Sequence, residues 1–162
     1  MVAAVMEGSR PLLLEVQALT AFTKMTSPRR TVVGADYNRA IIVLAVLEKR
    51  AEIKTAALDV FINIAGGIRA GEPAIDLPMA LSVASSYKNR PIAGDVACAG
   101  EIGLAGEIRA ISQVEARVRE GAKLGFTKGV IPSNNANKIE RVDGIELIGV
   151  SSVDEALEVL IS

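Results

Sequence analysis

The sequence predicts an α/β fold with a mixed sheet, in the broad sense that includes α+β arrangements, on three observations. Short apolar runs of strand length lie between segments with the 3.6-residue spacing of helices. The two kinds of element are mixed along the chain without strict alternation, which favours a sheet with both parallel and antiparallel pairs. The 162 residues suit one domain, and a hydrophobic content of 50% can form a substantial core. We therefore expect residues 1–162 to form a single domain.

The first half of the chain predicts three strands and two helices. The strands are indicated by apolar or β-branched runs at 12–19, 31–33 and 58–64. Residues 20–27, between the first two runs, are polar and predict an irregular connection. Asp36 and Asp76 are N-cap candidates for helices that end near 51 and 87. The second helix is apolar on most sides, which indicates heavy burial.

The second half predicts three more strands, at 96–102, 128–132 and 145–150. The glycine-rich turn 103–106 folds the first of them into a hairpin with 107–109. Two Ser-x-x-Glu capping boxes, Ser112 with Glu115 and Ser152 with Glu155, predict the starts of helices. Gly125 ends the first of these helices. Ser133 is expected to cap a short polar helix.

Composition excludes several kinds of site. The chain has no histidine and one cysteine, Cys98, so a His-containing zinc site, a Cys–His pair and a Ser–His–Asp triad are ruled out. Cys98 lies in an apolar run, which predicts a buried free thiol. Acidic residues lack the spacing of a metal site. We therefore expect no metal and no cofactor in this chain.

The sequence also lacks the usual signals of a membrane or exported protein. Residues 1–6 are apolar but few, and Glu7 follows them, unlike a signal or transit peptide. No apolar run reaches the roughly 18 residues that a membrane helix needs. Because a single cysteine also fits a reducing compartment, we expect a cytoplasmic protein without a membrane partner.

Charge is nearly balanced overall but uneven along the chain. The 18 basic and 19 acidic side chains give a net charge that does not itself predict a nucleic-acid partner. Residues 1–54 hold 8 basic and 5 acidic side chains, whereas residues 55–162 hold 10 and 14. The early excess gathers around Lys24, Arg29, Arg30 and Arg39. This excess is either an ordinary solvated surface or an anion-binding one.

The loop 63–77 has the framing of an active site but no nucleophile. An apolar strand leads into it, three glycines and Pro73 follow closely, and a helix comes behind. The loop holds no serine, threonine or cysteine, and its glycine spacing fits neither a P-loop nor a dinucleotide fingerprint. A Ser–Lys dyad remains open to a chain without histidine, and Ser82 with Lys88 is its candidate. Lys88 sits at a helix end, however, where we expect an exposed and protonated amine.

Two motifs carry a family resemblance. The loop Gly66–Leu77 and the run Gly100-Glu101-Ile102-Gly103-Leu104-Ala105-Gly106-Glu107-Ile108 resemble the proteolytic domain of Lon proteases. The resemblance implies a Lon-like fold of the ribosomal protein S5 domain 2 type. Matched position by position, Ala74 stands where that family has its nucleophilic serine, and Glu115 stands where it has its lysine. The resemblance therefore implies a site with no catalytic residue.

A wider set of segments resembles the C-terminal Lon-like domain of the RadA (Sms) family of bacterial DNA repair proteins. These segments are 8–19, Pro28-Arg29-Arg30, 47–51 and 72–77, and the resemblance covers nearly the whole chain. The family also has a zinc-finger module and a RecA-like ATPase module, which this sequence does not contain. ATP, magnesium and zinc are thus expected only in those modules, and the chain resembles an excised C-terminal fragment.

The resemblance implies a non-enzymatic role. RadA-type proteins are hexameric, ATP-driven DNA motors that promote branch migration with RecA, so the implied role of this domain is ring assembly and non-specific binding of single-stranded or branched DNA. Arginines suit backbone-directed binding because they hold phosphates bidentately without reading sequence. The expected DNA-binding residues are Arg30, Arg39, Arg69 and Arg109, followed by Arg29 and Lys24. The alternative for each is a surface residue beside a carboxylate, and the alternative function is a residual or unconventional Ser/Lys peptidase of the Lon superfamily.

Overall fold

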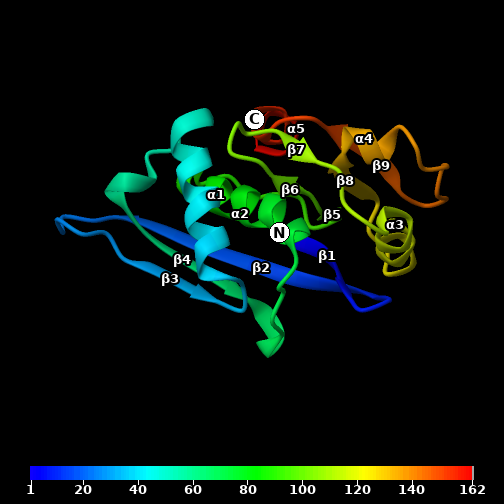
Figure 1. Cartoon of the computed structure of the whole chain (residues 1–162), viewed down its shortest axis with the longest axis horizontal. Helices are drawn as coiled ribbons and strands as arrows, with labels where there is room; N and C mark the ends of the chain where they lie inside the picture. The colour runs from blue at the N-terminus through cyan, green and yellow to red at the C-terminus, as the bar shows by residue number, and fades with distance from the viewer. Residues whose placement is uncertain (162) are drawn as a thin grey trace.

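A seven-stranded sheet forms the centre of the computed structural model, which describes residues 1–161 (Figure 1). In spatial order its strands are β3 (Arg30–Val33), β4 (Leu58–Ile64), β2 (Arg10–Phe22), β1 (Val2–Glu7), β5 (Val96–Cys98), β8 (Lys128–Pro132) and β9 (Glu146–Val150). The pairs β1–β2 and β2–β4 are antiparallel, and the other pairs are parallel. The predicted mixed α/β fold is therefore confirmed. The predicted hairpin is also present, as β6 (Glu101–Ile102) and β7 (Ile108–Arg109).

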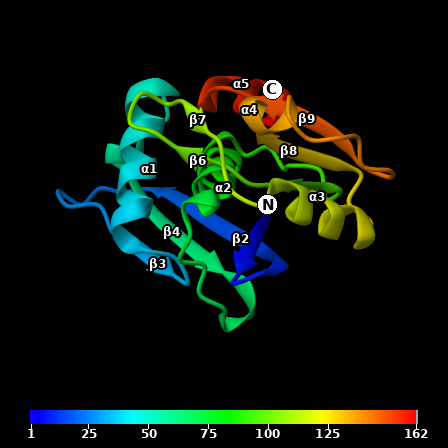
Figure 2. The ribbon, with the colours of Figure 1, turned by 45° about the vertical axis from the view of Figure 1, so that its right-hand side comes forward.

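Helices cover both faces of the sheet, but unequally (Figures 1 and 2). They are α1 (Tyr37–Arg50), α2 (Asp76–Lys88), α3 (Val114–Lys123), α4 (Ser133–Ala136) and α5 (Val153–Ile161). Side chains of α1, α2 and α5 join the sheet in the main core, whereas α3 and α4 pack with β8 and β9 in a smaller cluster. Within residues 1–161 no helix is long and apolar enough to cross a membrane.

The main core is aliphatic, as the low aromatic content predicts, and α2 lies at its middle. This helix contacts β2, α1 and α5, and every residue from Asp76 to Ala84 is buried. Leu77 and Leu81 are 0% exposed, and burying a leucine side chain stabilises a fold by about 1.5–3 kcal/mol. The prediction of a heavily buried helix is confirmed.

The N-terminal run was left unassigned by the sequence, yet it forms β1 near the middle of the sheet. It pairs with β2 on one side and with β5 on the other. Ala3, Ala4 and Val5 are buried because layers of side chains lie above and below this strand. A continuous apolar run without alternation is typical of such a doubly covered strand. The next strand also exceeds the prediction, because β2 continues to Phe22 into the stretch expected to be irregular.

Local end signals predict some helix starts correctly. The Asp36 carboxylate accepts a hydrogen bond from the Arg39 N–H at 2.9 Å, which confirms the predicted N-cap of α1. At α5 the Ser152 hydroxyl accepts from the Glu155 N–H at 3.1 Å. The Glu155 carboxylate accepts from the N–H of Ser151 rather than Ser152, so half of that predicted capping box forms.

The predicted capping box of Ser112 and Glu115 is wrong. Helix α3 begins at Val114, after Gln113 in a left-handed conformation with φ 53°, and no side chain caps it. Glu115 is exposed and pairs with Arg119 one turn later, at 2.6 Å. The short helix α4 likewise begins at Ser133 itself, with Pro132 preceding it, so Ser133 is not its cap.

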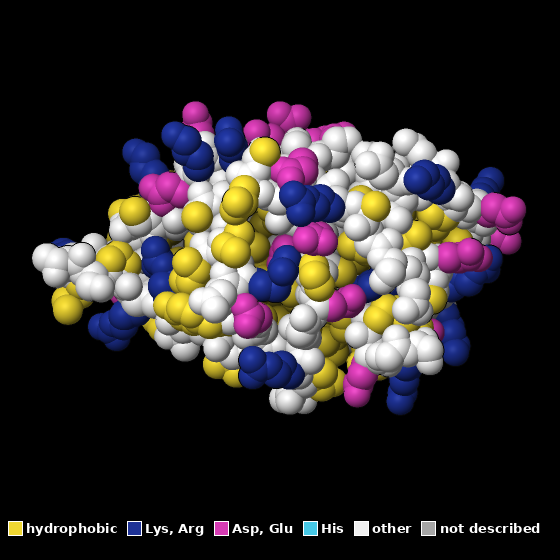
Figure 3. Space-filling model, in the orientation of Figure 1, with side chains coloured by type: hydrophobic (Ala, Val, Ile, Leu, Met, Phe, Trp, Pro, Cys, Tyr) yellow, Lys and Arg dark blue, Asp and Glu magenta, His cyan; other side chains and the backbone are white. Residues whose placement is uncertain are grey.

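Basic and acidic side chains are interspersed on the face of the molecule shown in Figure 3. The connection between β2 and β3 forms the most prominent projection, at the left of Figures 1 and 3. Leu19 and Val33, on β2 and β3, are 61% and 54% exposed. The half of the sheet made of β3, β4 and β2 therefore carries helices on one face and presents apolar side chains on the other.

Candidate functional site

The loop after β4 folds into a turn between β1 and β6. Gly66 and Gly67 adopt φ of 89° and 69°, and a single 3-10 turn, Pro73–Ile75, then leads into α2. The backbone of Gly100 holds this turn in place. Its N–H donates to the Ala74 carbonyl at 2.9 Å, and its carbonyl accepts from the Leu77 N–H at 3.0 Å.

The two hydrogen bonds between Gly100 and the turn explain why the strand predicted over 96–102 divides into β5 and β6. The chain leaves the main sheet at Gly100 because the backbone groups of that residue are bonded to the turn. A Cβ atom on Gly100 would lie 3.1 Å from the Ile108 side chain and 3.2 Å from that of Leu77. The close approach of the turn to the hairpin therefore favours glycine at this position.

Ala74 occupies the tip of the turn, where the Lon resemblance places a nucleophile. Its side chain is 2% exposed and packs with Ala4 and Ala99 in a small apolar cluster. A methyl group offers no nucleophilic atom, and the side chains packed against it are apolar. The tip of the turn thus forms part of the packed interior.

Glu72, at the start of the turn, is held by a buried arginine of α3. Arg117 is 1% exposed, and its Nη1 and Nη2 donate to the two carboxylate oxygens of Glu72 at 2.5 and 2.7 Å. The remaining donors are also used, since Nη1 donates to the Ala4 carbonyl and Nε to the Ser112 carbonyl. The Met6 N–H donates to the same carboxylate at 2.6 Å. Glu72 therefore links α3, β1 and the turn.

Arg117 is not among the residues predicted from the sequence, although a signal for it was present. Arg117 shares the spacing of Val114, Val118 and Gly121, which places it on the inner stripe of α3. An arginine on such a stripe has to find a partner when the helix packs, because an unpaired buried charge is very costly. The sequence could have flagged the residue but not its partner, which lies 45 positions earlier.

Asp76, at the end of the turn, is held by Arg39 of α1. The carboxylate accepts from Arg39 Nε at 2.9 Å and Nη2 at 2.5 Å, and from the Ile102 N–H at 3.1 Å. Burial raises the pKa of the Asp76 carboxyl, and the bonds from Arg39 and Ile102 oppose part of that rise. The prediction that Asp76 caps α2 is wrong, because Asp76 is already helical and its side chain points to α1 and β6.

A cavity of about 140 Å³ lies beside the turn. Its walls are Glu72, Pro73, Ala74, Glu101, Ala110, Ile111, Ser112 and Arg117. Glu72 is saturated by Arg117 and Met6, so it is not free to act as a base. Glu115 does not line this cavity, because it points to solvent on α3. The lining that the structure describes therefore contains no lysine or histidine beside a nucleophile.

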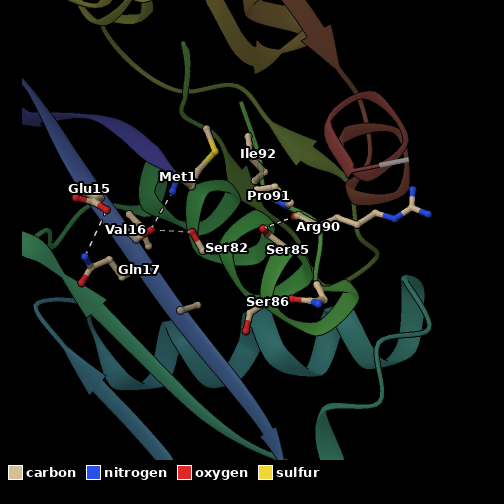
Figure 4. Close-up of a pocket in the computed structure, with 12 residues that line it drawn as sticks. Met1, Glu15, Val16, Gln17, Ser82, Ser85, Ser86, Arg90, Pro91 and Ile92 are labelled. Carbon is tan, nitrogen blue, oxygen red and sulfur yellow. Dashed lines mark hydrogen bonds between the residues drawn. The ribbon is translucent and has the colours of Figure 1, made fainter. Parts of the chain in front are cut away.

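The alternative dyad of Ser82 and Lys88 is not assembled either (Figure 4). The Ser82 hydroxyl is buried at the edge of a pocket of about 440 Å³, between the carbonyls of Pro78 at 2.8 Å and Val16 at 3.1 Å. Lys88 is exposed at the end of α2 and does not line that pocket. The Ser82 proton is shared with carbonyl oxygens, which are not bases that could activate a nucleophile.

The predicted DNA-binding arginines differ in how far they are engaged within the protein. Arg39 is committed to Asp76, and Arg109 contacts Glu107 at 3.0 Å and Glu101 at 3.9 Å. Arg39 and Arg109 are brought together, because Arg39 also lies 3.9 Å from Glu101. Their charges are therefore largely matched by neighbouring carboxylates.

The other candidates lie at the start of β3 and on two loops. Arg30 donates to the carbonyls of Leu58 and Thr55, which fixes its guanidinium at the start of β4. Lys24 and Arg29 are exposed on the β2–β3 connection. Arg69 is exposed on the glycine-rich loop, and within residues 1–161 no ion pair engages its side chain. Lys24, Arg29 and Arg69 are thus the candidates with the most available charge.

Cys98 plays no part in this region's chemistry. It is buried and free, which confirms the prediction. Burial raises the pKa of its thiol, so the reactive thiolate is suppressed. Within residues 1–161 no cluster of three or more Cys, His, Asp or Glu side chains is placed to hold a metal ion.

The fold and the site define an α/β domain in which the turn between β4 and α2 has a buried alanine, Ala74, at its tip. The chain belongs to the ChlI family, described as "Subunit ChlI of Mg-chelatase", whose family model matches residues 20–135.

The chain is also similar to proteins named DNA repair protein RadA. The chain is 46% identical over 161 residues to RadA of Streptococcus pyogenes, 47% over 158 residues to that of Halalkalibacterium halodurans, and 45% over 156 residues to that of Bacillus subtilis. These alignments cover 99%, 98% and 96% of this chain but only 36%, 35% and 34% of the relatives. The chain spans about a third of the length of these relatives and matches their C-terminal part.

Proposed function

We propose that this chain is the non-catalytic, Lon-like domain of a RadA-type DNA repair protein, in which it serves ring assembly and non-specific DNA binding during branch migration. The observation that carries the proposal is the turn 72–76, whose tip is the buried Ala74 and whose two end carboxylates are both paired with arginines. A turn held in this way has a structural role. The name DNA repair protein RadA, which relatives at 45–47% identity carry, supports the assignment to repair.

The DNA-binding part of the proposal depends on side chains that are free to reach phosphates. Lys24, Arg29 and Arg69 are exposed, whereas Arg39 and Arg30 would have to give up existing bonds. We therefore assign the main phosphate contacts to Lys24, Arg29 and Arg69, with Arg109 in a supporting position. Contacts of this kind do not select a sequence.

The ring-forming part of the proposal concerns the open half of the sheet. Leu19 and Val33 expose apolar surface there, and such surface is often covered by a neighbouring subunit. In the whole protein the ring would be hexameric and would act together with RecA. Light scattering on the purified chain tests assembly, and a mass of one subunit at every concentration would count against self-assembly through this domain.

DNA binding is tested by fluorescence anisotropy with labelled oligonucleotides over a range of salt concentrations. Neutralising about three phosphates predicts a slope of log affinity against log salt of about −2 to −3. Replacing Lys24, Arg29 and Arg69 with alanine should remove most of that slope. The matched control replaces the exposed Lys123, Lys138 and Arg141 and should keep it. Equal losses in both triple variants would contradict the assignment of these contacts.

A further inference from the structure

The strand β2 is longer than the helix that covers it. Along its inner face Val16 is 1% exposed, and Thr20 is still covered by α2, since the Ser86 hydroxyl accepts from the Thr20 N–H at 2.9 Å. Phe22 is the next residue but one, and its side chain is 79% exposed because α2 ends at Lys88. Phe22 therefore lies on the inner face of β2 but has no helix to pack against.

Phe22 begins a projection, residues 22–30, that extends beyond the rest of the molecule (Figures 1 and 3). We refer to these residues as the β2–β3 projection. Its sequence contains Lys24, Arg29 and Arg30 and no acidic residue. The nearest carboxylate that contacts it, Asp59, accepts from the backbone N–H of Arg29 at 2.7 Å. Lys24 and Arg29 are exposed, so their charged groups are accessible to solvent.

The base of the projection is held by specific bonds, so its side chains are displayed from a defined backbone. The Thr23 N–H donates to the Ala57 carbonyl at 3.1 Å, and the Thr23 hydroxyl accepts from the Met25 N–H at 3.1 Å. Arg30 closes the other end through the carbonyls of Leu58 and Thr55. The exposed Phe22 ring therefore stands at the start of a segment that is anchored at both ends and carries the exposed Lys24 and Arg29.

We propose that the β2–β3 projection binds single-stranded nucleic acid, with the Phe22 ring stacked on a base and with Lys24 and Arg29 on the flanking phosphates. A phenylalanine ring can stack on any base but has no hydrogen-bonding group, so it binds without reading sequence. In a duplex the faces of the bases are covered by neighbouring pairs, and the ring gains nothing. The inference rests on the proposed DNA-binding function and adds to it the segment and the aromatic residue that would favour a single strand over a duplex.

An anionic membrane surface is the competing partner for an apolar and basic tip. The projection has two large exposed apolar side chains, Phe22 and Met25, at 79% and 63%, separated by polar residues. Membrane anchoring needs a wider apolar face than these two side chains supply. The observations therefore favour nucleic acid, and vesicle binding becomes an outcome of the test.

The test measures the affinity of the 162-residue chain for a labelled oligothymidylate and for a duplex of equal length. We expect Phe22→Ala to weaken single-strand binding roughly 5- to 100-fold and to change duplex binding less than about twofold. Phe22→Trp should keep the preference for single strands. Leu104→Ala, at the tip of the β6–β7 hairpin and 73% exposed, is the matched control and should change neither affinity. Thermal melting checks that all three variants keep the fold.

The outcomes separate this inference from the proposed function. Phe22→Ala with unchanged affinity, or with equal losses on both DNA forms, overturns the role of the ring but leaves salt-sensitive DNA binding in place. If the wild type binds vesicles of anionic phospholipid, and Phe22→Ala loses that binding but keeps its affinity for DNA, the inference is overturned in favour of a membrane contact. A wild-type chain that binds neither DNA form refutes the proposed DNA-binding function and this inference together.

Discussion

The buried Arg117 of α3 and the half-buried Glu72 of the turn before α2 form a bidentate ion pair, with N–O distances of 2.5 and 2.7 Å. A second pair, Arg39 with Asp76, holds the other end of the same turn. Removing two charges from water is costly, and a pair offsets that cost only when the remaining donors also find partners. Arg117 meets this condition through the carbonyls of Ala4 and Ser112. The turn that carries Ala74 is therefore fixed from both ends.

Replacing Arg117 with leucine is expected to lower the free energy of unfolding by about 2–4 kcal/mol, because the half-buried Glu72 carboxylate and the buried Ala4 carbonyl would lose their donor. Urea unfolding followed by circular dichroism measures this loss. The control is Arg119→Leu, two residues along α3, where the exposed pair with Glu115 contributes about 0–1 kcal/mol. Similar losses in the two variants would show that the Arg117 pair is not the fixing element.

Replacing Arg39 with alanine is expected to lower the free energy of unfolding by about 2–3 kcal/mol, since Asp76 is buried and would lose two charge-assisted hydrogen bonds. Arg69→Ala removes the same charge from an exposed loop and should leave stability within about 0.5 kcal/mol. Comparing the stability of the two variants distinguishes Arg39, whose charge stabilises the fold, from Arg69, whose charge is available to bind DNA. A stable Arg39→Ala protein that has lost DNA affinity would instead give Arg39 a direct binding role.

Ala74→Ser restores a hydroxyl at the tip of the turn but is expected to give no peptidase activity. The position of the lysine is held by Glu115, which points to solvent, so no base lies beside the new serine. The double variant Ala74→Ser with Glu115→Lys should also be inactive. Cleavage of labelled casein measures activity, and turnover by either variant would show that the frame still supports catalysis.

Stability should depend on pH through Glu48 of α1. Its carboxylate accepts from the Thr55 hydroxyl at 2.6 Å and from the Ala56 N–H at 2.7 Å, and these bonds lower the pKa of Glu48 below its ordinary 4.5. Because the folded pKa lies below the unfolded one, this stabilisation is complete above the ordinary value and is lost as pH falls through the folded value.

The advantage of the wild type over Glu48→Gln in melting temperature should therefore shrink as the pH is lowered from 7 to below 4.5. Glu158→Gln removes the same charge from an exposed position on α5 and serves as the control. A gap between wild type and Glu48→Gln that stays constant over this range would argue against the predicted linkage.

Elements whose signals are local were predictable from the sequence. The apolar run that became β4 and the Asp36 cap of α1 depend on residues within one or two turns of each other. Ala74 at the expected nucleophile position, the absence of histidine and the family resemblance also followed from the sequence. These features need no knowledge of which distant segments meet.

Tertiary structure decided the features that depend on distant partners. Asp76 has the composition of an N-cap, but a 3-10 turn before it and Arg39, 37 positions away, give its carboxylate another role. Ser112 and Glu115 fit a capping box, but the Ser112 carbonyl accepts from Arg117 and the helix begins two residues later. In each case a buried charged group needed hydrogen-bond partners. Leaving it without them would cost more free energy than the contribution of about 1 kcal/mol that a helix cap makes.

The sequence alone therefore determined that this protein has an α/β architecture and a loop, 63–77, without serine, threonine or cysteine. Only the tertiary structure decided which arginines are internal and which are free. The buried Arg117 is bound to Glu72 and Arg39 is bound to the buried Asp76, whereas Lys24, Arg29 and Arg69 keep their charge at the surface. The physical reason is that the free-energy cost of burying a charge depends on the chain segments packed around it. The sequence alone does not show which segments those are.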